Sequence, residues 1–231
     1  MSSLPPDQQR LAAAIDHTLL KPGLLASQVE ALCAEAMAHQ FAAVCVPPGF
    51  VKLAKQACSH SAVQVATVIG FPFGYSAVEA KLAETLLALV DGADELDVVI
   101  NFTAIKNNDW ELIANEINHL LPIIHGKGKK IKTIIESGVL SAEEIIRCCQ
   151  IYGAAGVDFV KTSTGYAEKG ATLEAVHLMR ANLPAHVAIK ASGGIRTPEF
   201  ALQLLDAGAS RLGTSSGIAL VGNQHIQASS Y

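Results

Sequence analysis

Val157-Asp158-Phe159-Val160-Lys161-Thr162-Ser163 and His186-Val187-Ala188-Ile189-Lys190-Ala191-Ser192 are two apolar, β-branched stretches, and residues 172–181 between them have a helical pattern. A strand, a helix and a second strand in this order are typical of a parallel sheet whose strands are connected by helices. The unit therefore predicts an α/β fold. Each stretch also carries a lysine near its carboxyl end, which packing alone does not explain.

The same alternation of strand and helix continues along nearly the whole chain. Eight expected strands, with no GxGxxG motif after the first, favour a single-domain (β/α)8 barrel of the TIM type over an open doubly wound sheet, which is the alternative. We expect one domain over residues 1–231, with a C-terminal tail from about residue 223. The expected strands are 13–17, 42–47, 63–70, 95–101, 132–137, 158–163, 186–192 and 211–215, and the expected helices are 27–39, 76–91, 109–125, 141–152, 172–181 and 198–206. Only a short helix fits between the eighth strand and the C-terminal tail.

Several residues mark where the expected helices begin and end. Ser141 can accept an early backbone N–H while Glu144 reaches back to the start of the helix, which is a capping box. Gly92, Gly153 and Gly208 follow apolar helical stretches, where a left-handed cap requires a residue without Cβ. These signals agree with the strand and helix order.

The composition narrows the classes of protein to consider. The chain has 231 residues, 50% of them hydrophobic and 16% charged, and a net charge of −4, which disfavours a nucleic-acid partner. Five cysteines without a CxxC pair fit neither a disulfide framework nor a zinc site. The first residues lack the pattern of a signal peptide, and no apolar run is long enough to span a membrane. We therefore expect a cytoplasmic protein without a membrane partner.

Lys161 and Lys190 are candidates for reactive amines. They occupy consecutive expected strands, the sixth and the seventh, close to the ends at which barrels build their sites. Burial and a neighbouring positive charge both favour the neutral amine, which is the nucleophile that forms a Schiff base with a carbonyl. The alternative is that each lysine extends past the barrel rim. Two such lysines in successive strands favour the reactive interpretation.

Asp97 is a carboxylate among aliphatic residues in the expected strand 95–101. Because side chains alternate along a strand, Asp97 shares a face with Glu95, Val99 and Asn101 and can point into the barrel toward a lysine. The alternative is a structural ion pair with no part in turnover. The sequence leaves both open.

Glycine-rich segments follow the last two expected strands. Gly193-Gly194-Ile195-Arg196 follows the seventh and Gly213-Thr214-Ser215-Ser216-Gly217 follows the eighth, and these two loops frequently bind phosphate in barrels of this kind. Glycine allows backbone N–H groups to approach an anion, and serine or arginine adds donors. The alternative is that the glycines only satisfy tight turns.

Other chemistries have little support in the sequence. The eight histidines form no HxH or HExxH spacing, so no metal is expected, and no GxSxG segment suggests a serine hydrolase.

Four segments of the chain are specific. They are Ile15-Asp16-His17-Thr18-Leu19-Leu20, Glu95-Leu96-Asp97-Val98-Val99-Ile100-Asn101, Val160-Lys161-Thr162-Ser163-Thr164-Gly165 and Ile189-Lys190-Ala191-Ser192-Gly193-Gly194-Ile195-Arg196-Thr197. Two shorter segments, Phe71-Pro72-Phe73-Gly74 and Lys132-Thr133-Ile134-Ile135-Glu136-Ser137, lie between them. With these segments in the same order as in the family, the chain closely resembles the deoxyribose-phosphate aldolases from about Ile15 to Ser216.

The resemblance implies a role for each matching residue. Lys161 would form the Schiff base, with Asp97 and Lys190 transferring protons. Supporting roles would fall to Asp16, Thr18 and the C-terminal Tyr231, because a C-terminal tyrosine reaches the site in some members. Tyr166 departs from the pattern, since some members have lysine there. The phosphate contacts would come from Gly165, Gly193, Gly194, Arg196, Gly213, Ser215 and Ser216.

The resemblance also implies the reaction. A class I lyase of this family, which uses neither metal nor cofactor, cleaves 2-deoxy-D-ribose 5-phosphate reversibly to acetaldehyde and D-glyceraldehyde 3-phosphate in the catabolism of deoxyribonucleotides. Its partners would be the phosphorylated sugar and the aldehydes, and a homodimer and a homotetramer both stay open. Two alternatives remain: a Schiff-base aldolase or transaldolase for another phosphorylated sugar, and a sugar-phosphate-binding barrel without activity.

Overall fold

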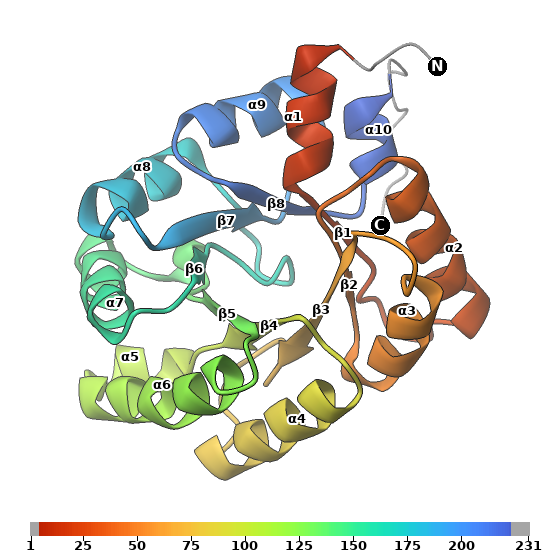
Figure 1. Ribbon diagram of the computed structural model, residues 1–231. Helices are drawn as coiled ribbons and strands as arrows, with labels where there is room; N and C mark the ends of the chain where they lie inside the picture. Colours follow the sequence, from red (N-terminus) through yellow and green to blue (C-terminus); the bar gives the residue numbers. More distant parts are fainter. Residues whose placement is uncertain (1–4, 223–231) are drawn as a thin grey trace.

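Eight parallel strands close into a barrel in sequence order, as Figure 1 shows for the computed structural model, which describes residues 5–222. The first and last strands pair with each other, with Ile15 opposite Leu212, so the sheet has no free edge. The predicted (β/α)8 barrel is confirmed and the open sheet is wrong. The strands are β1 Ile15–Thr18, β2 Ala43–Val46, β3 Gln64–Ile69, β4 Glu95–Val99, β5 Lys130–Ile134, β6 Phe159–Lys161, β7 Ala188–Ser192 and β8 Arg211–Thr214.

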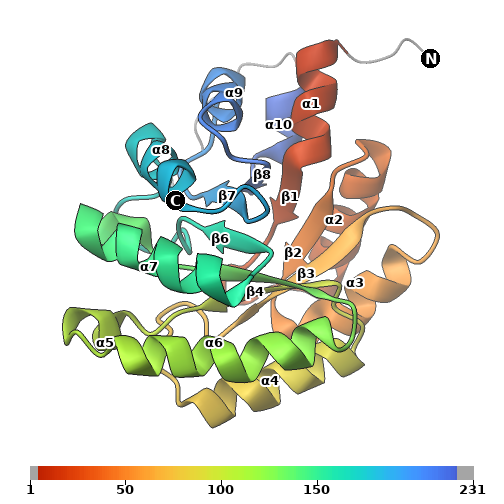
Figure 2. The ribbon, with the colours of Figure 1, turned by 60° about the vertical axis from the view of Figure 1, so that its left-hand side comes forward.

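Helices form a ring around the barrel (Figures 1 and 2). The N-terminal helix α1 packs against α9 and α10, so the two ends of the described chain meet on one side. Within residues 5–222, no helix is both long and apolar enough to cross a membrane. The helices are α1 Pro6–Ala14, α2 Ala26–Ala38, α3 Val51–Ala57, α4 Val78–Val90, α5 Phe102–Lys106, α6 Trp110–His125, α7 Ala142–Ala155, α8 Leu173–Asn182, α9 Pro198–Asp206 and α10 Gly217–Val221, with 3-10 turns at Pro48–Phe50 and Ser137–Val139.

The two faces of each strand contact different surroundings. Side chains that face the helices form one large apolar core. Partners in neighbouring parallel strands face the same side of the sheet, and the pairings Val68 with Asp97 and Asp97 with Lys132 place charged side chains inside the barrel. A small apolar cluster of Cys45, Ala66 and Val68 fills the interior on the β2–β3 side. The charged groups therefore occupy the opposite part of the interior.

The helix-end predictions are confirmed except at one glycine. Ser141 and Glu144 form the expected capping box of α7, and Gly92 has a φ of +100° after α4. The prediction for Gly153 was wrong: α7 continues to Ala155, and Gly156 after it has a φ of +81°. A Cβ at Gly153 would lie 2.7 Å from Cδ of Pro184, so close packing between α7 and the loop after α8 requires this glycine.

Candidate active site

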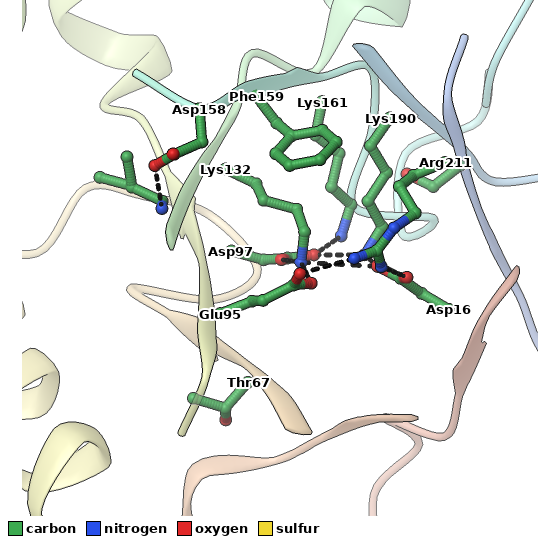
Figure 3. A network of polar contacts seen from close by, with 12 residues as sticks. Asp16, Thr67, Glu95, Asp97, Lys132, Asp158, Phe159, Lys161, Lys190 and Arg211 are labelled. Atoms are coloured by element: carbon green, nitrogen blue, oxygen red, sulfur yellow. Dashed lines mark hydrogen bonds and ion pairs between the residues drawn. The ribbon is translucent and has the colours of Figure 1, made fainter. Parts of the chain in front are cut away.

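Seven charged side chains meet inside the barrel (Figure 3). They come from six strands, and six of the side chains are at most 2% exposed. Each is in hydrogen-bond or ion-pair distance of a group of opposite charge, which is what burial of charge requires. They are Asp16 on β1, Glu95 and Asp97 on β4, Lys132 on β5, Lys161 on β6, Lys190 on β7 and Arg211 on β8.

Lys161 and Lys190 lie side by side, as their strand positions suggested. Their Cα atoms are register partners of β6 and β7. Both amines donate to the same oxygen of Asp97, Oδ2, at 2.7 Å. The two nitrogens are therefore at most 5.4 Å apart, which is twice that distance. Asp97 holds the two amines close enough for the charge of one to act on the other.

Asp16 and Thr18 lie next to this cluster. Asp16 Oδ2 is 2.5 Å from Lys190 Nζ, and Arg211 binds the other oxygen of Asp16. The Thr18 hydroxyl donates to the Asp16 carbonyl at 2.8 Å and lines the cavity above. Asp16 thus contacts Lys190, whereas Thr18 lies between the cluster and the cavity.

The electrostatics of the two lysines differ. Burial lowers the pKa of Lys161, and although Asp97 opposes this effect, the positive charge of Lys190 adds to it. Burial also lowers the pKa of Lys190, but Asp16 and Asp97 together outweigh burial, so its pKa is raised. For Asp97, the three surrounding lysines outweigh burial and hold the pKa well below its usual range. Lys161 is therefore the amine that loses its proton first, and Asp97 stays an anion.

Sequence reasoning missed Glu95, Lys132 and Arg211 as members of the cluster. Lys132 Nζ lies 2.8 Å from Asp97 Oδ1 and 2.6 Å from Glu95 Oε2, and Arg211 binds Glu95 Oε1 at 2.5 Å. All three were the first residues of their expected strands, where charge is ordinary, so the pattern gave no signal. Glu95 and Arg211 do begin β4 and β8, whereas Lys132 is the third residue of β5.

A cavity of about 920 Å³ opens at the carboxyl ends of the strands. Lys161 lines it, whereas Asp97, which binds Lys161, and Lys190 are fully buried and do not line it. Every residue proposed for phosphate binding also lines this cavity: Gly165, Gly193, Gly194, Arg196, Gly213, Ser215 and Ser216. One cavity therefore joins the amine to the glycine-rich loops.

The loops after β6 and β7 touch through their backbones. A Cβ at Gly170 would lie 2.3 Å from the carbonyl oxygen of Gly193, and the Ala171 N–H donates to the carbonyls of Ser192 and Gly193 at 3.0 and 3.1 Å. Gly193 itself has a φ of +84°. Its backbone conformation therefore depends on a glycine in the neighbouring loop.

Glu136 and Tyr166 hold the loop after β6 from two sides, and neither contact was predicted. Glu136, which has a φ of +50°, accepts from the Thr164 N–H at 3.1 Å and from the Thr164 hydroxyl. The Tyr166 hydroxyl donates to the Leu20 carbonyl at 3.2 Å, which connects the loops after β6 and β1 across the mouth of the cavity.

Two predictions concern groups that the structure does not place. Tyr231 lies outside the described residues. Among residues 5–222, no three His, Cys, Asp or Glu side chains are grouped to hold a metal ion.

Comparisons with known proteins agree with this geometry. Residues 10–223 match the model of the DeoC/LacD family aldolases. The chain is 48% identical, over 91% of its length and 95% of the relative, to deoxyribose-phosphate aldolase from Thermococcus gammatolerans. A solved aldolase, QR15, has a TM-score of 0.86 at 38% identity, covering 91% of this chain and 94% of that one. The tetrameric deoxyribose phosphate aldolase of Aeropyrum pernix has a TM-score of 0.86 at 31% identity, covering 93% and 90%. The chain belongs to the DeoC/LacD family of aldolases.

Proposed function

We propose that this chain is a deoxyribose-phosphate aldolase, a lyase that cleaves 2-deoxy-D-ribose 5-phosphate reversibly to acetaldehyde and D-glyceraldehyde 3-phosphate. The observation that carries the proposal is the sharing of Asp97 Oδ2 by Lys161 and Lys190 beneath a cavity whose far wall is made of glycine-rich loops. Relatives that carry this activity in their names support the choice of substrate. The lysine pair supplies the nucleophile, and the loops supply the site for the phosphate.

Lys161 forms the covalent intermediate. Its neutral amine adds to the aldehyde carbon C1, and the Lys190 ammonium protonates the hydroxyl of the carbinolamine, which leaves as water. A positively charged iminium at Lys161 and a neutral Lys190 result. The positive charge has moved from one lysine to the other, and the net charge of the buried cluster is unchanged.

The iminium then draws electrons from the sugar. Neutral Lys190 takes the 3-hydroxyl proton through a water molecule as the C2–C3 bond breaks, which gives an enamine on Lys161 and releases D-glyceraldehyde 3-phosphate. Lys190 next returns its proton to C2 of the enamine. Hydrolysis of the resulting iminium releases acetaldehyde and restores the neutral Lys161 and the Lys190 ammonium.

Asp97 has a different part from the one the resemblance implied. A carboxylate whose pKa lies well below the usual range is a weak proton acceptor. Three lysines surround it at 2.7 to 2.8 Å. In this proposal Asp97 orients the two amines and stabilises whichever one is positive, while Lys190 carries the proton.

The phosphate holds the reacting end of the sugar against Lys161. Backbone N–H groups of the loops after β7 and β8, with Arg196 and Ser215, would bind the dianion at the mouth of the cavity. Binding energy from this remote group orients C1 at the amine and lowers the barrier. An unphosphorylated sugar should therefore react poorly.

The assembly and the location of the protein are also proposals. Because the Aeropyrum pernix relative is tetrameric, we propose a homo-oligomer, either a dimer or a tetramer, in the cytoplasm. Size-exclusion chromatography with light scattering distinguishes the two sizes, and a monomer would contradict both.

A substrate screen tests the function. The wild type and Lys161→Met are incubated with 2-deoxyribose 5-phosphate, ribose 5-phosphate and fructose 6-phosphate, and the aldehyde released is measured with a coupled dehydrogenase. We expect acetaldehyde from the 2-deoxy sugar with the wild type alone. Cleavage of another sugar phosphate instead would indicate a different Schiff-base aldolase or a transaldolase, and binding without cleavage would indicate a binding protein.

A further inference from the structure

We propose that Lys132 is a positioning residue for the Schiff-base reaction, whose permanent positive charge balances the buried carboxylates around Asp97 and leaves Lys161 as the free amine. This inference rests on the function proposed above. Lys132 is fully buried and is not among the residues that line the cavity of the candidate active site, so its effect must pass through other side chains.

Lys132 reaches the cluster from the side opposite the cavity. Its side chain is fully buried, and its Nζ lies 2.8 Å from Asp97 Oδ1, 2.6 Å from Glu95 Oε2 and 3.5 Å from Asp16 Oδ2. The two amines of the lysine pair bind the other oxygen of Asp97, Oδ2. Figure 3 shows Lys132 and the lysine pair converging on this one carboxylate. Lys132 thus fixes the orientation of Asp97 toward the pair.

The aromatic ring of Phe159 lies beside the same charged groups. Lys132 Nζ is 5.9 Å and Arg211 Cζ is 5.7 Å from the ring centroid, both within range of a cation–π contact. Phe159 and Lys132 are both buried. The positive charge on Lys132 is therefore screened little and acts strongly on its neighbours.

A count of charges shows why this cation matters. The cluster contains three carboxylates and four basic side chains, so full ionisation would leave one uncompensated positive charge inside the barrel. An unbalanced buried charge is costly. Burial and the charge of Lys190 lower the pKa of Lys161 against the effect of Asp97, whereas carboxylates raise the pKa values of Lys132, Lys190 and Arg211 against the effect of burial. With Lys161 neutral, three positive charges balance three negative ones.

Two further titratable groups face Lys161, and neither enters this count. Burial raises the pKa of the Cys45 thiol on β2, so Cys45 remains a neutral thiol. Glu136, beyond the end of β5, has a pKa raised by burial and is bound to Thr164 rather than to Asp97.

Replacing Lys132 with methionine should therefore move a proton onto Lys161. Without Lys132 the remaining cations fall one short of the carboxylates, and protonation of Lys161 restores the balance. A unit charge roughly 6 Å away, at an effective dielectric constant of about 20, changes a pKa by about 2 units. We expect the acidic limb of the kcat/KM profile of Lys132→Met to lie about 2 pH units higher, with a loss of about 100-fold below the limb and recovery at alkaline pH.

Two companion variants separate charge from structure. Glu95→Gln/Lys132→Met removes one charge of each sign, so its limb should return to within about half a unit of the wild type. Glu95→Gln alone should move the limb to lower pH. Lys130→Met is the matched control, because Lys130 is an exposed lysine two residues away on the same strand.

The experiment measures kcat/KM for 2-deoxyribose 5-phosphate from pH 5 to 10, and in parallel the pH dependence of the adduct that acetaldehyde and cyanoborohydride form at Lys161. Two results would overturn the inference. One is an acidic limb of Lys132→Met that stays at the wild-type pH while the rate falls. The other is an acidic limb of Glu95→Gln/Lys132→Met that is shifted as far as that of Lys132→Met. If Lys132→Met does not fold, an unmoved limb in Glu95→Gln overturns it instead. Failure of the wild type to cleave the sugar refutes the proposed function, while the adduct profile still reports on the charge balance.

Discussion

The contact between Gly170 and Gly193 makes the phosphate site sensitive to a single methyl group. In Gly170→Ala the new Cβ would lie 2.3 Å from the Gly193 carbonyl oxygen and 2.5 Å from its carbonyl carbon. Both are backbone atoms, so no side chain can rotate away, and one loop must move. Gly193 is a proposed phosphate ligand, and the displacement should pull its N–H away from the anion.

Two costs determine the expected effect of Gly170→Ala, one on folding stability and one on phosphate binding. Overpacking of this kind costs about 1–3 kcal/mol of folding stability. A lost hydrogen bond to a charged group costs about 1.5–3 kcal/mol of binding, which corresponds to a factor of roughly 10 to 100. Lys161 and its neighbours lie below the loops, so the reaction of the bound aldehyde should change less than the binding of the phosphate.

The assay compares two substrates. For the wild type and Gly170→Ala, kcat/KM is measured with 2-deoxyribose 5-phosphate and with 2-deoxyribose, and the preference for the phosphorylated sugar should fall about 10- to 100-fold. Gly49→Ala is the control, because a Cβ at Gly49 meets no atom within 4 Å. An unchanged preference, or an equal loss with both sugars, would refute the assignment of these loops to the phosphate.

Three other predictions follow from the charged cluster. Lys161→Met should abolish turnover and keep the circular dichroism spectrum, because the lost amine is the nucleophile; residual turnover near the wild-type rate would contradict the covalent role. Thorough treatment with EDTA should leave the wild-type rate unchanged, and a loss that zinc restores would indicate a metal-dependent reaction. The pKa of Asp97 is lower in the folded chain than in the unfolded one, so Asp97 stabilises the fold fully above about pH 4 and loses this contribution as pH falls toward the folded pKa. The free energy of unfolding, measured with urea from pH 5 to 2, should therefore fall less steeply in Asp97→Asn than in the wild type.

The sequence predicted the barrel because its strand pattern is regular. Most ends of the eight strands lie within one or two residues of the ends of the expected ranges. The alternation of side chains along β4 correctly placed Asp97 inside the barrel. The helices α1, α3 and α5 were not predicted. The last two have only seven and five residues, too few for an apolar period to stand out.

The candidate site was predictable only in part, because contacts across the barrel depend on register. The pattern identified Lys161 and Lys190, but the sharing of one Asp97 oxygen follows from the pairing of β4, β5, β6 and β7. Lys132 appeared in a quoted segment without a role, since only the closed barrel brings it to the far side of Asp97. Gly153 was misread because its reason is a tertiary contact with Pro184.

The identity of the lysine that traps the carbonyl is the central claim. The wild type is incubated with acetaldehyde, reduced with borohydride, digested and examined by mass spectrometry, with Lys161→Met treated in parallel. We expect an ethyl group on Lys161 of the wild type and no such group in Lys161→Met. An ethyl group on Lys190, or an unmodified wild type, would contradict the account.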